Sequence, residues 1–224
     1  MKNTLSTVVL LLFCISSLPA LSQTRSYDIV IYGGTSAGVA AAIESSRMGK
    51  SVVLIEPSQH LGGLTTGGLG ATDIGNKQAI GGISREFYQN IKKHYDDPAH
   101  WTLQTREEYF SLNERRTSDG EDAMWTFEPS AAKKVYQDMM AKEDIDLIIG
   151  KRLDRSKGVA TRGNRIIKIT METGETFEGK VFMDATYEGD LLATAGVTYT
   201  IGRGIIKNMG KPSTVSKPTN IMSP

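Results

Sequence analysis

Glycines suited to binding a phosphate group lie near one acidic residue. Twelve of the 23 glycines fall between positions 33 and 82. The first stretch is Gly33-Gly34-Thr35-Ser36-Ala37-Gly38, and Glu56 follows further along the chain. Backbone N–H groups in such a turn can bind an anionic pyrophosphate, and a carboxylate can accept hydrogen bonds from ribose hydroxyls. These residue types predict a dinucleotide site in which Glu56 disfavours a 2′-phosphate.

The segments around this turn predict one βαβ unit. Their composition indicates a strand over residues 27–32, a helix over 39–48 and a second strand over 51–55. Both strands are apolar and β-rich, as expected of strands buried on two faces. Gly33 lets the chain turn tightly after the first strand, and Gly38 lets the helix pack close to the sheet. Glu56 then stands at the tip of the second strand.

One position departs from the G-x-G-x-x-G pattern of dinucleotide-binding turns. The pattern places its second glycine at position 35, where this chain has Thr35. We expect Gly34 to supply the flexibility at this point and the Thr35 side chain to crowd the backbone near the phosphates. A βαβ unit that binds no nucleotide is the alternative.

A second glycine-rich stretch, HLGGLTTGGLG, covers residues 60–70. We expect a long flexible loop here, followed by a helix over about residues 85–95 with Ser84 as N-cap. Loops of this length in compact domains are usually functional, and a disordered loop is the alternative. His60 in the loop and Arg85 at the head of the helix are candidates for a catalytic role. Packing or phosphate contact is the favoured interpretation of both, so no catalytic residue is assigned.

These motifs resemble a known family. The chain is similar to the secreted FAD-dependent oxidoreductases of the glutathione-reductase-like flavoprotein superfamily in four segments: YDIVIYGGTSAGVAAAIESSRMGKSVVLIEP, LGGLTTGGLGATDIG, GGISREFY and DATYEGDLLATAGV. The resemblance extends over about residues 27–203 and corresponds to the N-terminal, FAD-binding portion of such proteins. It implies that FAD is the cofactor.

The resemblance also implies which residues contact FAD. Glu56 binds the adenosine ribose, and Asp184 belongs to a second segment that contacts the cofactor. The remaining contacts, with the pyrophosphate and the ribityl chain, come from Gly33, Gly34, Thr35, Ser36, Ala37, Gly38, Gly62, Gly63 and Leu64. No metal site is predicted, because His94 and His100 have no neighbours at metal-ligand spacing.

The rest of the chain completes an α/β fold. A helix over 130–142 and a strand over 145–149 precede three strand-like pieces near 151–159, 165–171 and 176–183. Three such pieces predict an antiparallel β-meander, which in this superfamily crosses over before the chain rejoins the parallel sheet. We therefore expect a Rossmann-like, parallel-sheet FAD-binding domain over residues 23–206. An insertion at about 96–128 carries aromatic residues that are more typical of core than of a substrate platform.

Both ends of the chain have signatures of their own. Residues 1–22 combine a positive start, an apolar run and small residues before Gln23, which predicts a cleavable signal peptide and export to the periplasm or beyond. An uncleaved anchor is the alternative; after cleavage no stable membrane span is expected. Residues 207–224 hold three prolines without apolar periodicity and are expected to form a disordered tail. Because the resemblance stops near Arg203, we expect a truncated or frame-shifted product.

Composition narrows the function. The formal net charge of +1 disfavours a nucleic-acid binder, and the single cysteine, Cys14, lies in the predicted signal peptide. The sequence favours a FAD-dependent oxidoreductase that transfers a hydride to flavin from a small-molecule or carbohydrate-like substrate. A truncated, non-catalytic FAD-binding fragment is one alternative. An NAD-binding dehydrogenase domain is the other, although the long glycine loop and the meander favour FAD.

Overall fold

The computed structural model describes residues 24–113, 116–118 and 120–200. The predicted signal peptide and the predicted tail lie outside these residues. In the described part, one six-stranded sheet has the order β3-β2-β1-β6-β5-β4. Its parallel strands are β3 (Ile145–Ile149), β2 (Val52–Glu56), β1 (Thr24–Tyr32) and β6 (Thr176–Asp184). From β6 the sheet continues as an antiparallel meander, formed by β5 (Arg165–Thr170) and β4 (Val159–Arg162). The predicted fold class is confirmed.

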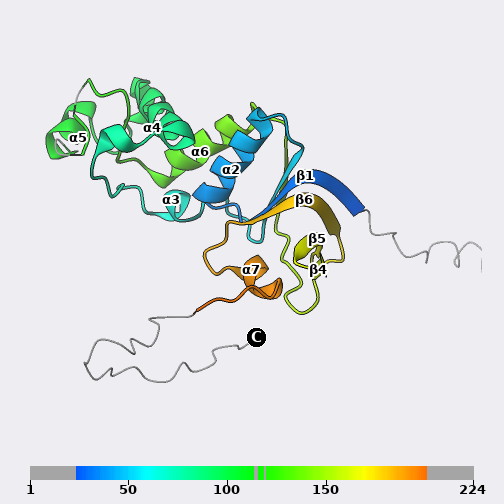
Figure 1. Cartoon of the computed structure of the whole chain (residues 1–224). Helices are drawn as coiled ribbons and strands as arrows, with labels where there is room; N and C mark the ends of the chain where they lie inside the picture. The colour runs from blue at the N-terminus through cyan, green and yellow to red at the C-terminus, as the bar shows by residue number, and fades with distance from the viewer. Residues whose placement is uncertain (1–23, 114–115, 119, 201–224) are drawn as a thin grey trace, which may run out of the picture.

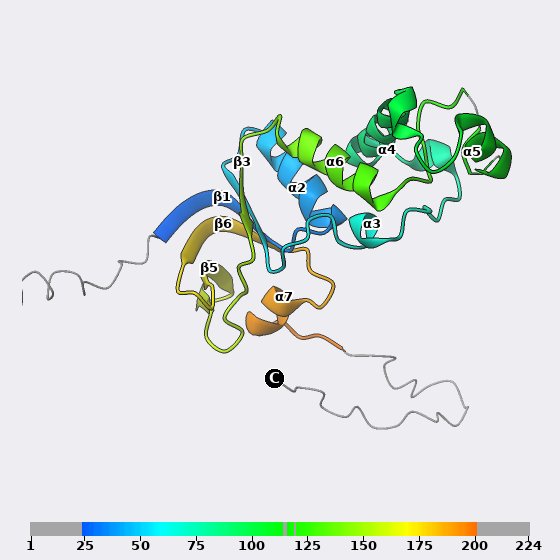
Figure 2. The ribbon, with the colours of Figure 1, turned by 180° about the vertical axis from the view of Figure 1, so that it is seen from behind.

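Helices cover one face of the sheet (Figures 1 and 2). This helical layer consists of α2 (Ser36–Arg47), α4 (Gly82–Tyr95) and α6 (Pro129–Met140), with α5 (Arg106–Asn113) at its far end. On the opposite face, α7 (Asp190–Thr194) and the meander, which is the other end of the same sheet, pack against β1. Shorter turns are α3 (Gly63–Gly67), η1 (Lys77–Ala79) and η2 (Pro98–His100). Within the described residues, none of these helices combines the length and apolar character needed to cross a bilayer.

The alternation of side chains along β1 explains why both faces are covered. Ile31 belongs to the buried cluster under the helices, together with Leu54 of β2. Val30 and Tyr32 belong to the opposite cluster, together with Ile169 of the meander. Successive residues of a strand point to opposite faces, so a strand covered on both sides is apolar throughout. That is why the last four residues of β1, Ile29–Tyr32, form a continuous apolar run, whereas its first three residues are polar and exposed.

Three parallel strands end at one edge of the sheet. The register pairs Tyr32 of β1 with Ile55 of β2 and with Asp184 of β6. Glu56 follows Ile55 directly, so Glu56, Asp184 and the turn that begins at Gly33 share this carboxyl edge. Open α/β sheets bind their ligands at such an edge. The fold therefore gathers the predicted site residues where a ligand is expected.

The strand expected near 151–159 begins only at Val159. The carboxylate of Asp154 accepts hydrogen bonds from the N–H groups of Ser156 and Lys157, at 3.0 and 3.3 Å, and folds a turn instead. A Cβ on Gly158 would lie 2.2 Å from the carbonyl oxygen of Asp154. Local side-chain hydrogen bonds thus compete with the strand and delay its start.

The second glycine stretch is more ordered than expected. It contains α3, in which the Thr66 hydroxyl donates to the carbonyl oxygen of Leu61 at 2.5 Å. The following helix starts at Gly82, and its N-cap is Gly81 (the expected N-cap, Ser84, is wrong). Glycine is an acceptable N-cap because its backbone enters the helix without a side-chain clash.

Candidate functional site

The chain turns sharply at Gly33, directly after β1. The φ angle of Gly33 is +107°, in the region that favours glycine. Its N–H donates to the carbonyl oxygen of Ile55 at 2.8 Å. A Cβ at this position would lie 2.6 Å from the backbone of both Ala185 and Thr186. The turn therefore needs glycine both for its conformation and for the approach of the segment that follows β6.

The buried carboxylate of Glu56 holds this turn. Its Oε2 accepts a hydrogen bond from the N–H of Gly34 at 2.6 Å. Its Oε1 accepts from the N–H and the hydroxyl of Ser58, at 2.7 and 2.5 Å. A Cβ on Gly34 would lie 2.9 Å from the Cβ of Glu56, so glycine is needed here for close approach, not for flexibility. Since a carboxylate oxygen can accept two hydrogen bonds, Oε2 keeps one acceptor position.

Thr35 caps α2 and does not crowd the turn, contrary to expectation. Its Oγ1 accepts the N–H of Gly38 at 3.4 Å and donates to the carbonyl oxygen of Ala185 at 2.7 Å. Only 8% of the residue is exposed. A threonine in place of the pattern's second glycine is thus accommodated because its side chain serves as the N-cap.

The first turn of α2 is suited to an anion. The N–H of Ala37 has no hydrogen-bond acceptor within the described residues, and this turn contains no acidic side chain. A Cβ on Gly38 would lie 1.9 Å from the carbonyl oxygen of Gly33, so the helix packs directly against the turn. Unpaired N–H groups at a helix start attract negative charge.

The second glycine-rich stretch lies against the first. The N–H of Gly62 donates to the carbonyl oxygen of Gly34 at 2.7 Å. The hydroxyl of Ser36 donates to the carbonyl oxygen of Gly62 at 3.1 Å and lies 2.7 Å from the hydroxyl of Thr65. Gly62 and Gly63 have φ angles of +97° and +56°. The structure thus brings the two predicted glycine stretches together at the start of α2.

Tyr187 makes a contact that sequence reasoning missed. Its hydroxyl accepts the N–H of Leu64 at 2.8 Å, across 123 residues of sequence. A Cβ on Gly63 would lie 2.3 Å from the same hydroxyl. Residues so far apart give no local pattern, and the only signal was the DATYEGDL motif that contains Tyr187. The tyrosine joins the segment after β6 to the second glycine stretch.

Asp184 organises that segment. Its Oδ1 accepts hydrogen bonds from the N–H and the hydroxyl of Thr186, at 3.0 and 2.7 Å. Its Oδ2 accepts the N–H of Leu192 in α7 at 2.8 Å. These bonds hold the turn that carries Ala185 and Tyr187 against the glycines. Asp184 lies at the expected edge of the sheet, and its hydrogen bonds stay within its own segment.

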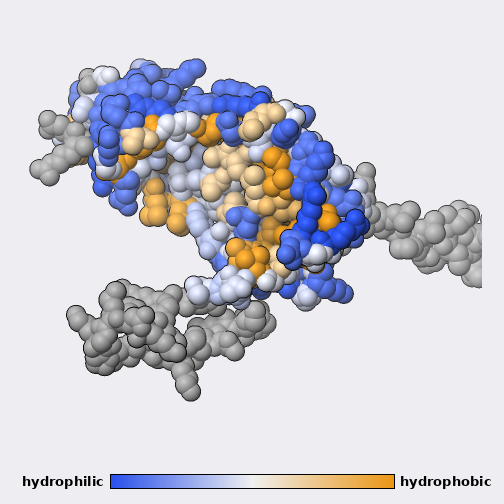
Figure 3. Space-filling view, in the orientation of Figure 1, coloured by the Kyte–Doolittle hydropathy of each residue, from blue (hydrophilic) through white to orange (hydrophobic). Residues whose placement is uncertain are grey.

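The surface around the site is partly apolar. Figure 3 shows a band of apolar and weakly polar residues along α2 and the adjoining strands, bordered by hydrophilic surface. Leu64 and Tyr187, at the second glycine stretch, are 53% and 59% exposed. Such surroundings suit the uncharged parts of a ligand.

Comparison with known proteins decides the family. The FAD dependent oxidoreductase family matches residues 28–223, which is most of the chain. The chain belongs to this family. FAD is therefore the cofactor, and the NAD-binding alternative loses its support.

Each of the following relatives matches only part of this flavoprotein, and this flavoprotein matches only part of each relative. A vinyl phenol reductase of Lactiplantibacillus plantarum is 47% identical over 55 residues, or 24% of this chain and 11% of that protein. The L-proline dehydrogenase of P. horikoshii matches 80% of this chain and 58% of its own, with 17% identity and a TM-score of 0.53. The L-amino acid deaminase of Proteus vulgaris matches 78% of this chain and 50% of its own, with 14% identity and a TM-score of 0.49. The chain spans less than two thirds of each.

The two candidates for a catalytic role in this flavoprotein are engaged by neighbouring groups. The Nε2 atom of His60 lies 2.8 Å from the hydroxyl oxygen of Thr66. The guanidinium of Arg85 pairs with Asp122 at 2.5 Å and donates to the carbonyl oxygen of Lys77 at 3.0 Å. These contacts agree with the packing interpretation of both residues.

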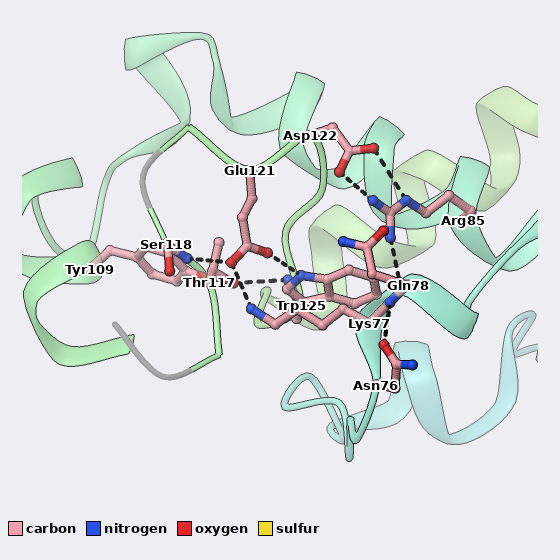
Figure 4. A network of polar contacts seen from close by, with 10 residues as sticks. All are labelled: Asn76, Lys77, Gln78, Arg85, Tyr109, Thr117, Ser118, Glu121, Asp122 and Trp125. Carbon is pink, nitrogen blue, oxygen red and sulfur yellow. Dashed lines mark hydrogen bonds and ion pairs between the residues drawn. The ribbon is translucent and has the colours of Figure 1, made fainter.

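Arg85 belongs to a polar network that fastens the segment before α4 (Figure 4). The Nζ of Lys77 lies 2.6 Å from Oε1 of Glu121. The indole N–H of Trp125 donates to Oε2 of Glu121 at 2.8 Å, and the N–H of Ser118 donates to Oε1 at 3.0 Å. Arg85 lies 5.4 Å from the centroid of the Trp125 ring, a cation–π distance.

Replacement of Thr35 tests its capping role. Thr35→Val removes the hydroxyl that caps α2 and should lower the free energy of unfolding by about 0.5–2 kcal/mol. Thr35→Ser keeps the hydroxyl and should retain most of the stability. Urea denaturation followed by circular dichroism measures both variants, and an equal loss in the two would contradict the capping role.

The Glu121 network predicts a dependence of stability on pH. Burial raises the pKa of Glu121, but the bonds from Lys77, Ser118 and Trp125 outweigh it and lower the pKa below 4.5. A depressed folded pKa means that the stabilisation is present above the unfolded pKa and is lost as pH falls through the folded one. Wild type should therefore lose more stability than Glu121→Gln between about pH 6 and pH 3.

The measurement is the urea midpoint at each pH. Glu107→Gln, at an exposed position of α5, serves as the matched control and should follow the wild-type curve. Parallel curves for wild type and Glu121→Gln would show that the network does not carry the pH dependence.

Proposed function

We propose that this chain is the FAD-binding part of an exported oxidoreductase that transfers a hydride to FAD from a small-molecule or carbohydrate-like substrate. One observation carries the proposal. The buried carboxylate of Glu56 bonds to the turn after β1, while the N–H of Ala37, in the helix that follows this turn, has no acceptor among the described residues. An acceptor for sugar hydroxyls and a donor for phosphate oxygens thus share one edge of the sheet.

The chemistry of these groups fits a flavin dinucleotide. The N–H of Ala37 provides a donor for a pyrophosphate oxygen, and the remaining acceptor position of Glu56 Oε2 suits a ribose hydroxyl. We assign Gly62, Gly63 and Leu64 to the path of the pyrophosphate and the ribityl chain. Bound FAD supplies the two-electron acceptor for the hydride of the substrate.

The surrounding residues position the cofactor. Ser36 and Thr65 link the two glycine stretches through their hydroxyls, and Tyr187 fixes the N–H of Leu64. Asp184 stabilises the turn that presents Tyr187. We assign no proton transfer to His60, because its ring is bonded to Thr66 within the loop.

The names of relatives support a small-molecule substrate. Vinyl phenol reductase and L-proline dehydrogenase are both named for small organic molecules. The non-catalytic FAD-binding fragment is the second candidate, and it is favoured by one observation. This chain spans 58% of the L-proline dehydrogenase, so the substrate-binding part of that enzyme need not have a counterpart here.

Weaker binding of FAD is the expected result of Glu56→Gln. The variant keeps the size of the side chain but removes the charge from a hydrogen-bond acceptor, which should lower FAD affinity about 10- to 100-fold. Quenching of flavin fluorescence during titration of the full chain measures the dissociation constant. Glu44→Gln, at an exposed position of α2, should bind FAD as wild type does.

Equal affinities of wild type and Glu56→Gln would contradict the ribose assignment, and failure of wild type to bind FAD would contradict the proposal as a whole. Anaerobic titration of the FAD-loaded chain with small-molecule donors then separates the two candidates. Loss of the visible flavin absorbance supports the oxidoreductase, whereas an unchanged spectrum with all donors supports the fragment.

Export is inferred from residues 1–22, whose pattern is that of a secretory signal. Expression in a bacterial host should deliver the chain to the exported fraction with Gln23 as its first residue. Deletion of residues 2–22 should keep it in the cytoplasm. N-terminal sequencing and mass spectrometry show whether the chain is cleaved before Gln23. A product that retains Met1 and lies in the membrane fraction would favour an uncleaved anchor instead.

A further inference from the structure

A cavity of about 330 Å³ lies at the C-terminal end of α4. Its wall is formed by Tyr95 of α4, the segment after η2, α5 and residues 124–128. A separate recess beside Ser36 borders α4 at Ile83. Roughly 18 Å of helix separates Ile83 from Tyr95. The cavity and the recess are separate hollows with the rings of Phe127 and Phe87 between them, whose centroids lie 5.6 Å apart.

Aromatic rings make up much of the wall: Tyr95, Trp101, Tyr109 and Phe127. Their polar atoms are bonded within the protein. The indole N–H of Trp101 donates to the carbonyl oxygen of Tyr95 at 2.8 Å, and the hydroxyl of Tyr109 donates to the carbonyl oxygen of Thr126 at 3.0 Å. What the rings offer a ligand is their carbon surface, whose faces attract cations.

Two polar groups in the wall keep unused hydrogen-bonding capacity. The hydroxyl of Thr126 is buried and has no hydrogen-bond partner of normal geometry within the described residues, although it also interacts with the hydroxyl of Tyr109. The carboxylate of Glu128 accepts one side-chain hydrogen bond in the described part of the chain, from the hydroxyl of Tyr95 to Oε2 at 3.1 Å. Burial raises the pKa of Tyr95 to about 12, so this phenol remains a neutral donor. Buried polar groups are stabilised when a partner satisfies them.

Thr126 and Glu128 are placed to act on one ligand. They stand two residues apart, and Glu128 has an extended backbone with φ −77° and ψ 145°. Both residues line the cavity.

The charged side chains that line the cavity determine which kind of ligand it can bind. Among the described residues, the cavity is lined by Glu128 and by no lysine or arginine. The other titratable side chain besides the tyrosines, His100, stacks on His94 with ring centroids 3.8 Å apart, and its Nδ1 lies 2.6 Å from the carbonyl oxygen of His94. A carboxylate without a basic partner repels anions and favours a positive ligand.

We propose that this cavity binds a small organic ammonium ion with an apolar or aromatic body. The ammonium group donates hydrogen bonds to Glu128 and Thr126 and lies against the aromatic rings. The body of the ligand packs on Phe127 and Met124. The volume of the cavity is at the lower end for ligand sites, which restricts the body to about one ring.

Calorimetric titration of the full chain, with and without FAD, tests the proposal with three probes of similar size. Benzylammonium carries the positive charge, benzyl alcohol is neutral and benzoate is negative. Benzylammonium should bind at least about tenfold more tightly than benzyl alcohol, and benzoate more weakly than both. FAD should leave these affinities unchanged. Fluorescence of Trp101, checked against Trp101→Phe, should respond to benzylammonium.

Two variants locate the contacts. Glu128→Gln keeps an acceptor for Tyr95 but loses the charge, and should weaken benzylammonium about tenfold while leaving benzyl alcohol unaffected. Thr126→Val should weaken benzylammonium about threefold. Glu107→Gln, an exposed acid of α5 that does not line the cavity, should have no effect.

Several results would overturn the proposal. They are the absence of benzylammonium binding, equal or tighter binding of benzyl alcohol or benzoate, competition with FAD, and unchanged affinity in Glu128→Gln. Circular dichroism establishes that each variant is folded. If Glu128→Gln does not fold, the three probes on wild type still decide, because a preference for the cation is required in any case.

Discussion

The hydrogen bond from the Gly34 N–H to the buried carboxylate of Glu56 is the constraint on which the site depends. It joins the tip of β2 to the turn after β1 and so sets where α2 begins. Burial of a carboxylate is costly, and the two donors of Ser58 together with Gly34 compensate for it. Glycine at position 34 is required because any side chain there would separate the partners.

Local patterns were enough to predict the parallel core and the glycine turn. Strands buried on both faces contain unbroken apolar runs, as β2 does, and the edge strand β3 was expected over the residues that form it. Prediction failed where particular side-chain hydrogen bonds, or contacts between segments distant in sequence, override the local propensity for helix or loop. The glycine- and threonine-rich α3 is a poor helix in isolation and depends on the bond from Thr66, while the link between Tyr187 and Leu64 joins segments with no shared local pattern.

Glycines in this site serve packing as much as ligand approach. Gly38 brings α2 onto the turn, Gly33 admits the segment after β6, and Gly63 leaves room for the hydroxyl of Tyr187. The glycine-rich motif therefore reflects how closely three chain segments pack against one another. The same reasoning explains why Thr35 is tolerated: its side chain has partners of its own in Gly38 and Ala185.

The pairing of β1 with β6 has a consequence for the order of assembly. These neighbours come from opposite ends of the described chain, and the Thr24 and Thr176 hydroxyls that meet between them are 152 residues apart. During synthesis one edge of β1 must wait for a partner that emerges much later. Pairing of strands that are distant in sequence slows folding, and the unpaired edge of β1 can meanwhile associate with other chains. The candidate FAD site is thus completed late in folding, although its glycine motif stands near the start of the sequence.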